Sequence, residues 1–328
     1  MELNNFLSKD TTQIIKGFAI LFMIAHHVLI KEFYMDQPEI LTNIFSIRLQ
    51  IGMKMCVGLF TFFVGYGAFY AKELDIRYIY KHIWRLLKCY WLVLLVTILI
   101  AYISNVCYDM PVTLLNFVGL MSQYNLGSWY IYFYIYALLV LPFIARLLKQ
   151  NTWTRLFYLI AFSCVVSYFT ESSYFILRAL SLCFFYTPIL AIGYACAQTQ
   201  IIGTISKLSD NAILWFIILL TTVLLRCITG GKYGFSTDIV FVPLFILSVA
   251  VFAWGGKILF SKTLSSLGRN SMFMWFIHAI PLSDATRPFF QDSVLWTNNV
   301  LILYFVLVVV SYLLSVGLKN VLKKVHYL

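Results

Sequence analysis

The sequence predicts an all-α membrane protein, a polytopic bundle of about ten transmembrane helices with both termini in the cytoplasm. Hydrophobic residues make up 62% of its 328 residues and charged residues only 11%, whereas a soluble domain contains about 25% charged residues. Because so few charges cannot cover a water-facing surface, we expect lipid to solvate most of the chain. No stretch between the apolar segments is long enough for a separate domain, so residues 1–328 are predicted to form one membrane domain.

Ten segments have the length and apolar character of a spanning helix, which needs about twenty mainly apolar residues. They are residues 13–32, 51–71, 86–105, 129–148, 154–170, 174–196, 211–229, 238–256, 271–290 and 298–317. A further apolar segment, residues 111–120, is too short to span, and Pro111 at its start and Gly127 after it are typical of chain turns. We expect this segment to lie in the interface or to re-enter the membrane.

The basic residues between these segments support an even number of helices. Cytoplasmic connections are enriched in Lys and Arg, and with the N-terminus inside, all but seven of the 24 basic residues fall on the cytoplasmic side. The exterior seven are Lys31, Arg48, Lys54, Arg178, Arg226, Lys232 and Arg287. The connection 106–127 contains no Lys or Arg, as an exterior loop should. The net charge of +11 is thus explained by topology and lipid headgroups, and no nucleic-acid partner is expected.

The seven cysteines lie mostly inside apolar runs and form no CxxC motif. They are therefore interpreted as small apolar residues of a membrane core. Neither a disulfide framework nor a metal site is expected from this pattern.

The first predicted helix carries the strongest candidate for chemistry. Lys16 and His27 are eleven residues apart, which is three helical turns plus about 20°, so both lie on one face about 16 Å apart along the axis. His26 points about 100° away. An imidazole that is neutral near pH 7 can act as the general base or acid of an acyl transfer. Two plainer interpretations stay open: His27 only hydrogen-bonds a neighbouring helix, and Lys16 only snorkels to the interface.

A basic stripe follows in the segment YIYKHIWRLLKCYW, residues 78–91. Lys81, Arg85 and Lys88 are spaced i, i+4 and i+7, which places them on one helix face, and Arg77 extends the stripe. Such a stripe can hold the phosphates of a nucleotide-like cofactor. It can equally hold anionic lipid headgroups.

Three further residues are candidates because of their predicted depth in the membrane. Arg178 lies inside the sixth predicted helix and requires a carboxylate or carbonyl partner, such as the nearby Glu171, which also allows a purely structural ion pair. His278 lies near mid-membrane, with Ser271 seven residues earlier on nearly the same face, so a polar pair that closes a helix contact is the alternative to a functional role. Trp129 is interpreted as an aromatic-belt residue unless another feature promotes it.

Four segments, spread in order along the chain, resemble the motifs of a known family. They are KGFAILFMIAHH (16–27), RLLKCYW (85–91), GSWYIYFYIYALLVLPFI (127–144) and LGRNSMFMWFIH (267–278). Together they resemble the acyltransferase-3 family of integral-membrane acyltransferases, whose first helix separates a basic residue and a His by ten residues, as Lys16 and His27 are separated here. Where that family usually has Arg, this chain has Lys16 and Lys88, which keep the charge but lack the planar fork that grips two oxygens.

The resemblance implies an O-acyltransferase that moves an acyl group, usually acetyl, from acetyl-CoA to a hydroxyl of a cell-envelope polysaccharide or lipid-linked sugar. It implies a multi-pass protein of the bacterial plasma membrane that uses acetyl-CoA as co-substrate and no metal. It also implies that Lys16 and His27 are catalytic, with His27 acting as general base or becoming acylated as a relay. Lys81, Arg85 and Lys88 would bind the phosphates of the donor.

A transporter or exporter of the same fold is the main alternative. Membrane-embedded Lys16, His27, Arg178 and His278 can form a proton or anion pathway instead of an active site. No internal repeat of the kind found in many transporters is evident, and this favours the enzyme. A third interpretation is a partner of a polymer synthase or flippase with no chemistry of its own.

Overall fold

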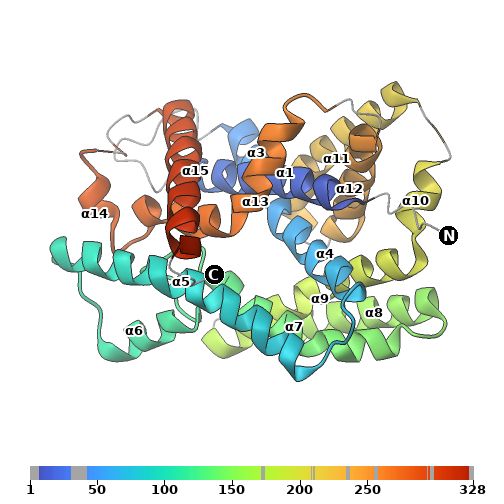
Figure 1. Ribbon diagram of the computed structural model, residues 1–328, viewed down its shortest axis with the longest axis horizontal. Coiled ribbons are helices and arrows are strands. Elements are labelled where there is room, and N and C mark those ends of the chain that lie inside the picture. The colour runs from blue at the N-terminus through green and yellow to red at the C-terminus, as the bar shows by residue number, and fades with distance from the viewer. Residues whose placement is uncertain are drawn as a thin grey trace. The chain divides into compact units, whose positions relative to one another are not determined.

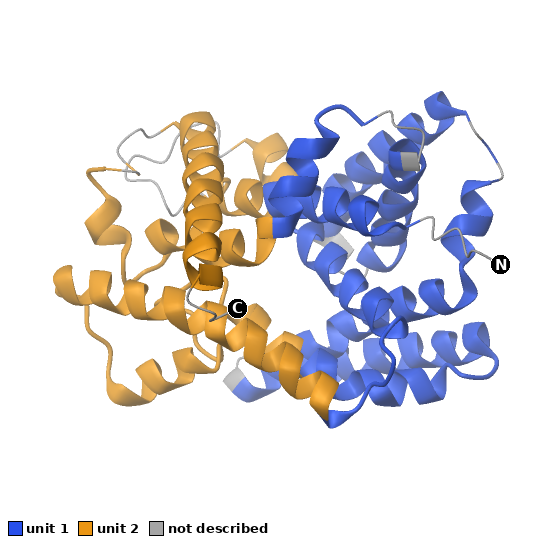
Figure 2. Ribbon diagram, in the orientation of Figure 1, with its two compact units in different colours: residues 1–22, 51–76, 136–269 blue, residues 23–50, 77–135, 270–328 orange. Residues whose placement is uncertain are grey.

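The computed structural model describes residues 7–30, 43–170, 174–207, 209, 211–233, 237–254, 258–293, 295 and 299–324. Within these ranges the regular structure is helical and contains no strand, which confirms the all-α class (Figure 1). By its contacts the chain divides into two compact units (Figure 2). Unit 1 comprises Met1–Phe22, Ile51–Ile76 and Tyr136–Arg269, and unit 2 comprises Met23–Gln50, Arg77–Ile135 and Asn270–Leu328.

Each of the ten predicted spans contains a helix. The longer helices are α1 (Lys9–Val28), α3 (Ile44–Met53), α4 (Met55–Phe69), α5 (Ile76–Ile103), α7 (Trp129–Leu147), α8 (Thr152–Thr170), α9 (Phe175–Thr199), α11 (Ala212–Tyr233), α12 (Asp238–Trp254), α13 (Ser261–Ile277) and α15 (Val300–Lys324). By length and composition, seven helical segments in the described residues can cross a membrane, with α3 and α4 counted together. These segments make the chain a polytopic membrane protein. The placement of both termini in the cytoplasm stays a prediction. Lys31, one of the seven cations predicted on the exterior side, lies outside the described residues.

The largest differences from the predicted helix boundaries occur in two spans. The ninth span was expected at residues 271–290, but α13 already begins at Ser261, ends at Ile277 and is followed by a short 3-10 helix, Ile280–Leu282, and by α14 (Arg287–Phe290). Pro281 contributes to this early end, because proline has no N–H to donate and its ring clashes with the preceding turn. The third span was expected from residue 86, but α5 begins at Ile76, since its basic first half consists largely of residues that are compatible with a helix.

The short apolar segment expected at 111–120 is the helix α6 (Met110–Phe117) of unit 2. Its first turn is capped by the Asp109 side chain, which accepts a hydrogen bond from the Val112 N–H at 3.1 Å. Gly119, just after the helix, has a φ of +74°, a conformation that glycine adopts without a Cβ clash. Capping and a glycine stop thus explain why this helix stays too short to span.

Glycines allow helices of unit 1 to pack at backbone contact. A Cβ built on Gly65 of α4 would lie 1.9 Å from the carbonyl oxygen of Leu190, and one on Gly193 of α9 would lie 2.1 Å from that of Phe62. Such close approach of small residues is a common way to hold membrane helices together, since lipid provides no hydrophobic force between them. The reciprocal contact fixes the crossing of α4 and α9.

The same device joins α1 to α13 within unit 1. A Cβ on Gly17 would lie 2.2 Å from the carbonyl oxygen of Leu264, and one on Gly268 would lie 1.9 Å from that of Gln13. Both helices then continue into unit 2, where α1 carries its C-terminal histidines and α13 ends before His278. The two helices therefore contact each other along their unit 1 parts. Their unit 2 parts lead to the histidines His26, His27 and His278.

Candidate active site

His27 and His278, which the sequence offers as separate candidates, contact each other directly in unit 2. His27 lies at the C-terminal end of α1, and His278 is the first residue after α13. Their Nδ1 and Nε2 atoms, respectively, are 2.8 Å apart, and the two ring planes are inclined by 15°. The exposed fractions are 6% for His27 and 1% for His278, so the pair is buried.

The hydrogen bonds of this pair specify a tautomer for each ring. His278 Nδ1 lies 2.8 Å from the carbonyl oxygen of Met274, and because a carbonyl only accepts, Nδ1 carries the proton. In the neutral ring Nε2 of His278 then holds the lone pair and accepts from the Nδ1–H of His27. The lone pair of His27 consequently resides on its Nε2, which is the nitrogen able to take a proton.

The loop before α7 holds the end of α13 in place. The Trp275 indole N–H donates to the carbonyl oxygen of Gly127 at 3.1 Å, and the Asn125 amide donates to that of Phe276 at 2.9 Å. A Cβ on Gly127 would lie 2.7 Å from the indole nitrogen, so this close approach requires glycine. The residues immediately preceding His278 are therefore anchored from a second chain segment.

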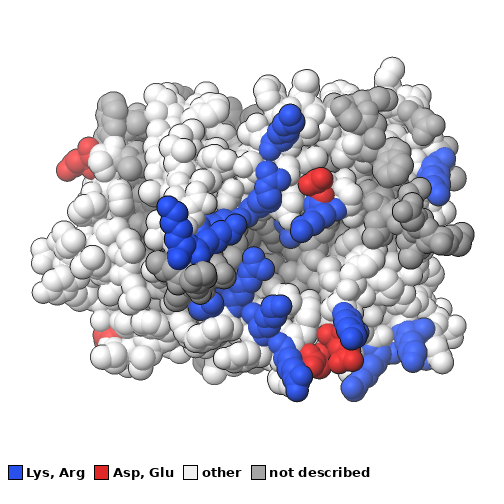
Figure 3. Space-filling view, in the orientation of Figure 1, with Lys and Arg blue, Asp and Glu red and all other residues white. Residues whose placement is uncertain are grey.

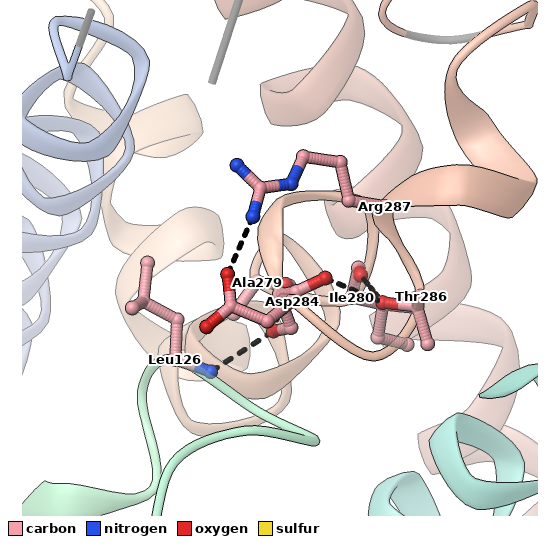
Figure 4. A network of polar contacts seen from close by, with 7 residues as sticks. Leu126, Ala279, Ile280, Asp284, Thr286 and Arg287 are labelled. Atoms are coloured by element: carbon pink, nitrogen blue, oxygen red, sulfur yellow. Dashed lines mark hydrogen bonds and ion pairs between the residues drawn. The ribbon is translucent and has the colours of Figure 1, made fainter. Parts of the chain in front are cut away.

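The turn after His278 is anchored to the same loop (Figure 4). The Ser283 hydroxyl accepts a hydrogen bond from the Leu126 backbone N–H at 3.0 Å. Asp284, in the same turn, pairs with Arg287 at the start of α14 (Figure 4). His278 thus lies between two anchored segments, which restricts how far its ring can move away from His27.

His26 has a different partner from its neighbour. Its Nδ1 lies 2.8 Å from the carbonyl oxygen of Gln50, to which it donates, so it ties α1 to α3 within unit 2. This arrangement agrees with the expectation that His26 and His27 point in different directions. It gives His26 a structural contact and leaves His27 as the candidate for chemistry.

Lys16 lies in unit 1 on the same continuous helix, α1. It is partly buried, and its Nζ lies 5.7 Å from the centroid of the Phe63 ring. An ammonium over an aromatic face at this distance is a favourable cation–π contact. Because α1 runs without a break from Lys9 to Val28, the spacing of Lys16 and His27 is helical throughout, as predicted.

The basic stripe Lys81–Arg85–Lys88 lies on α5, as expected from its spacing. Lys81 and Arg85 are exposed, and Lys88 is partly buried. Lys319 of α15, like Arg85 and Lys88, is within electrostatic range of the buried Cys89 thiol. No sequence spacing links residues 88 and 319, so this additional cation was not predicted. On the face shown in Figure 3, Lys and Arg side chains are more widespread than Asp and Glu.

Trp129 begins α7, two residues after the loop glycine that receives the Trp275 hydrogen bond. It packs edge-to-face on Tyr130, and the Tyr130 ring centroid lies 4.6 Å from that of Trp275. An aromatic cluster therefore connects Trp129 to the helix that precedes His278. A functional role for Trp129 beyond anchoring this segment stays a prediction.

Arg178 lies exposed on α9 in unit 1, and its expected partner Glu171 is outside the described residues. Arg178 is within electrostatic range of Lys54, which also belongs to unit 1. A second feature of unit 1 was missed: a buried ion pair between Arg226 and Asp238. The sequence did offer a sign of this pair. Asp238 is the first residue of the apolar segment 238–256, and Arg226 lies inside the preceding apolar segment, 211–229.

The fold and the composition define an integral membrane protein, and a buried histidine pair is its most distinctive polar feature. The chain belongs to the acyltransferase-3 family: the sequence model of this family, described as an acyltransferase domain, matches residues 13–319. The protein is therefore a multi-pass membrane protein with the acyltransferase domain of that family. No curated protein and no solved structure matches the chain.

Proposed function

We propose that the protein transfers an acyl group, acetyl in the expected case, from acetyl-CoA to a hydroxyl of a cell-envelope polysaccharide or lipid-linked sugar at the bacterial plasma membrane. The family membership supports acyl transfer in general. The observation that carries the mechanism is the buried pair in which His278 Nε2 accepts from His27 Nδ1. This pair prepares His27 Nε2 to act as a base.

The proposed chemistry moves one proton and exchanges one bond. The acceptor O–H gives its proton to His27 Nε2 while its oxygen forms a bond to the thioester carbonyl carbon. The C–S bond then breaks, and the leaving thiolate of coenzyme A takes the proton back from His27. A positioned general base of this kind contributes roughly 10² to 10⁴ in rate.

His278 acts in this mechanism as a positioning residue. It fixes the tautomer of His27 and accepts a charge-assisted hydrogen bond while His27 is protonated, as the aspartate does in a Ser-His-Asp triad. A relay in which His27 Nε2 is itself acylated uses the same nitrogen and the same orientation. Trapping of an acetyl group on the protein distinguishes the relay from direct transfer.

The donor-binding residues in this proposal are Lys81, Arg85 and Lys88, together with Lys319. Coenzyme A carries phosphates, and the stripe offers one guanidinium fork from Arg85 and ammonium charges from the lysines. Lys16 would hold a further anionic part of the donor. The assignment of the stripe rests on its charge and that of Lys16 on its helical spacing from His27, and the family usually has Arg where this chain has Lys16 and Lys88.

The decisive experiment uses the full chain in lipid nanodiscs with labelled acetyl-CoA and an envelope polysaccharide. We expect release of free coenzyme A and labelling of the acceptor by the wild type, and neither by His27→Ala at equal folding. A fully active His27→Ala protein would refute the assignment of His27. The exporter alternative predicts no release of coenzyme A in this assay, so one measurement separates the two functions.

A further inference from the structure

One fully buried side chain in unit 2, Asn125, uses both ends of its amide to connect the loop before α7 with the end of α13. Its exposed fraction is 0%. Its Nδ2 donates to the carbonyl oxygen of Phe276 at 2.9 Å, and its Oδ1 accepts from the Gly127 N–H at 3.0 Å. Because a carbonyl only accepts and a backbone N–H only donates, these partners fix the orientation of the amide.

The last turn of α13 needs a donor from outside the helix. Carbonyl groups in the last turn of an α-helix lack N–H partners within it, and Phe276 is the penultimate residue of α13. Pro281, four residues after Ile277, has no N–H that could continue the hydrogen-bond ladder. Asn125 supplies a donor to the Phe276 carbonyl and thereby caps the helix just before His278.

The hydrogen bonds of Asn125 and Trp275 close a ring. Gly127 donates its N–H to Asn125 and accepts the Trp275 indole N–H at its carbonyl oxygen. Trp275 is followed in the chain by Phe276, whose carbonyl returns to Asn125. Each of these bonds fixes a peptide or side chain that the next bond uses, so the ring constrains the end of α13 in more than one direction.

The loop that carries Asn125 is itself held in place. The Asn125 carbonyl oxygen accepts from the Ser128 N–H at 3.0 Å. From α5, Tyr90 donates its hydroxyl to the carbonyl oxygen of Asn116 at 2.6 Å, and its ring centroid lies 5.2 Å from that of Phe276. Tyr90 therefore contacts both the short helix before the loop and the end of α13, which makes the loop a firm support.

His278 takes its orientation from this helix end. Its backbone N–H and its Nδ1–H both donate to the carbonyl oxygen of Met274, at 3.1 Å and 2.8 Å. The contact of its Nε2 with His27 Nδ1, at 2.8 Å, depends on that placement. A displacement of the helix end by about 1 Å away from His27 would lengthen this contact beyond the normal range of a hydrogen bond.

We propose that Asn125 is a positioning residue of the active site, which holds His278 against His27 by tying the end of α13 to the loop before α7. The kinetic part of this inference rests on the proposed acyl transfer, in which His278 sets the tautomer of the base. The effect of Asn125 passes through the backbone of Phe276 and reaches His27 by way of His278.

The first test is kinetic and uses the full-length protein in nanodiscs. Asn125→Ala removes both hydrogen bonds of the amide. Asn116→Ala is the matched control, because Asn116 is equally buried and its side chain bonds to Val112, Gln123 and Tyr124. We expect Asn125→Ala to lower kcat about tenfold at an unchanged KM for acetyl-CoA, since a small misplacement of a catalytic group is enough for such a loss. The control should lower the unfolding temperature and keep kcat.

A double-variant cycle shows whether Asn125 acts through His278. If it does, Asn125→Ala should cause no further fall in kcat in a His278→Ala background, because the group that it positions is already absent. Trp275→Phe, which loses the indole N–H to Gly127, enters the same cycle and decides the matter if Asn125→Ala does not fold. Additive losses in the cycle, or equal kcat losses for Asn125→Ala and Asn116→Ala, would overturn the proposal.

A second readout does not require activity. With isotope-labelled histidine, the hydrogen bond between His27 Nδ1 and His278 Nε2 gives a scalar coupling between the two ring nitrogens in NMR spectra. We expect this coupling in the wild type and in Asn116→Ala, and its loss in Asn125→Ala. Coupling that persists in Asn125→Ala, or a wild type without it, would contradict the inference. A wild type that releases no coenzyme A would instead refute the proposed function, and the spectra would still test the role of Asn125.

Discussion

The role of His278 is tested most directly by its replacement with alanine. The change removes the acceptor of the His27 Nδ1–H, 2.8 Å away, and with it the group that fixes the His27 tautomer. In the transition state His27 is protonated, and a hydrogen bond from a charged group contributes about 1.5–3 kcal/mol, against about 0.5–1.5 kcal/mol for a neutral one. The difference between the charged and the neutral hydrogen bond, together with the loss of the fixed tautomer, predicts a fall in kcat of about tenfold to hundredfold.

The assay is the rate of coenzyme A release at saturating acetyl-CoA, followed with a thiol reagent. The KM for acetyl-CoA should stay near the wild-type value, because His278 positions His27 and does not hold the donor. His278→Gln is the informative control, since its amide oxygen can reach the place of Nε2 and accept from His27, so we expect it to keep more activity than His278→Ala. A His278→Ala protein with wild-type kcat, folded by thermal unfolding and gel filtration, would refute the reasoning.

Three further predictions concern the base, the donor site and the helix packing. His27→Ala should abolish transfer, whereas His26→Ala should keep activity and lose only some thermal stability, because His26 bonds to a backbone carbonyl of α3. Lys88→Ala should raise the KM for acetyl-CoA more than it lowers kcat. Gly65→Ala should destabilise the fold by about 1–3 kcal/mol, because its Cβ meets a carbonyl oxygen of α9. Gly67→Ala should be nearly neutral, because nothing lies within 4 Å of its Cβ position.

Each of these predictions has an opposite outcome that decides against it. If His27→Ala and His26→Ala lose activity equally, the two histidines have the same structural role and His27 is not the base. An unchanged KM for the Lys88 variant would favour lipid headgroups as the ligand of the stripe. Equal unfolding temperatures for the two glycine variants would show that the close crossing of α4 and α9 does not limit stability.

The helices could be predicted because the length and apolarity of a segment are local properties. The early end of α13 and the early start of α5 have local physical causes as well. Hydropathy does not register the break at Pro281, and it discounts the charged first half of α5, although its residues are compatible with a helix. The glycine contacts of α1 and α4 were not predicted, since only the partner backbone reveals that Gly17 and Gly65 lack room for a side chain.

The candidate site, like the fold, could be predicted only where it depends on local sequence. Helical spacing relates Lys16 to His27, and it places the three members of the basic stripe on one face. It cannot relate His27 to His278, which are 251 residues apart. The hydrogen bond between them, the additional cation from α15 and the ion pair of α11 and α12 all depend on tertiary packing. Sequence reasoning therefore proposed His27 and His278 as separate candidates but could not show that they contact each other.

The burial of the histidine pair has a consequence for the energetics of the reaction. In the proposed mechanism the proton leaves the acceptor hydroxyl, resides briefly on His27 and departs with coenzyme A, so none is exchanged with either aqueous compartment. The cycle is then electroneutral and draws nothing from a transmembrane proton gradient. Turnover in sealed vesicles should accordingly be the same with and without a protonophore, whereas a proton-coupled exporter would stop.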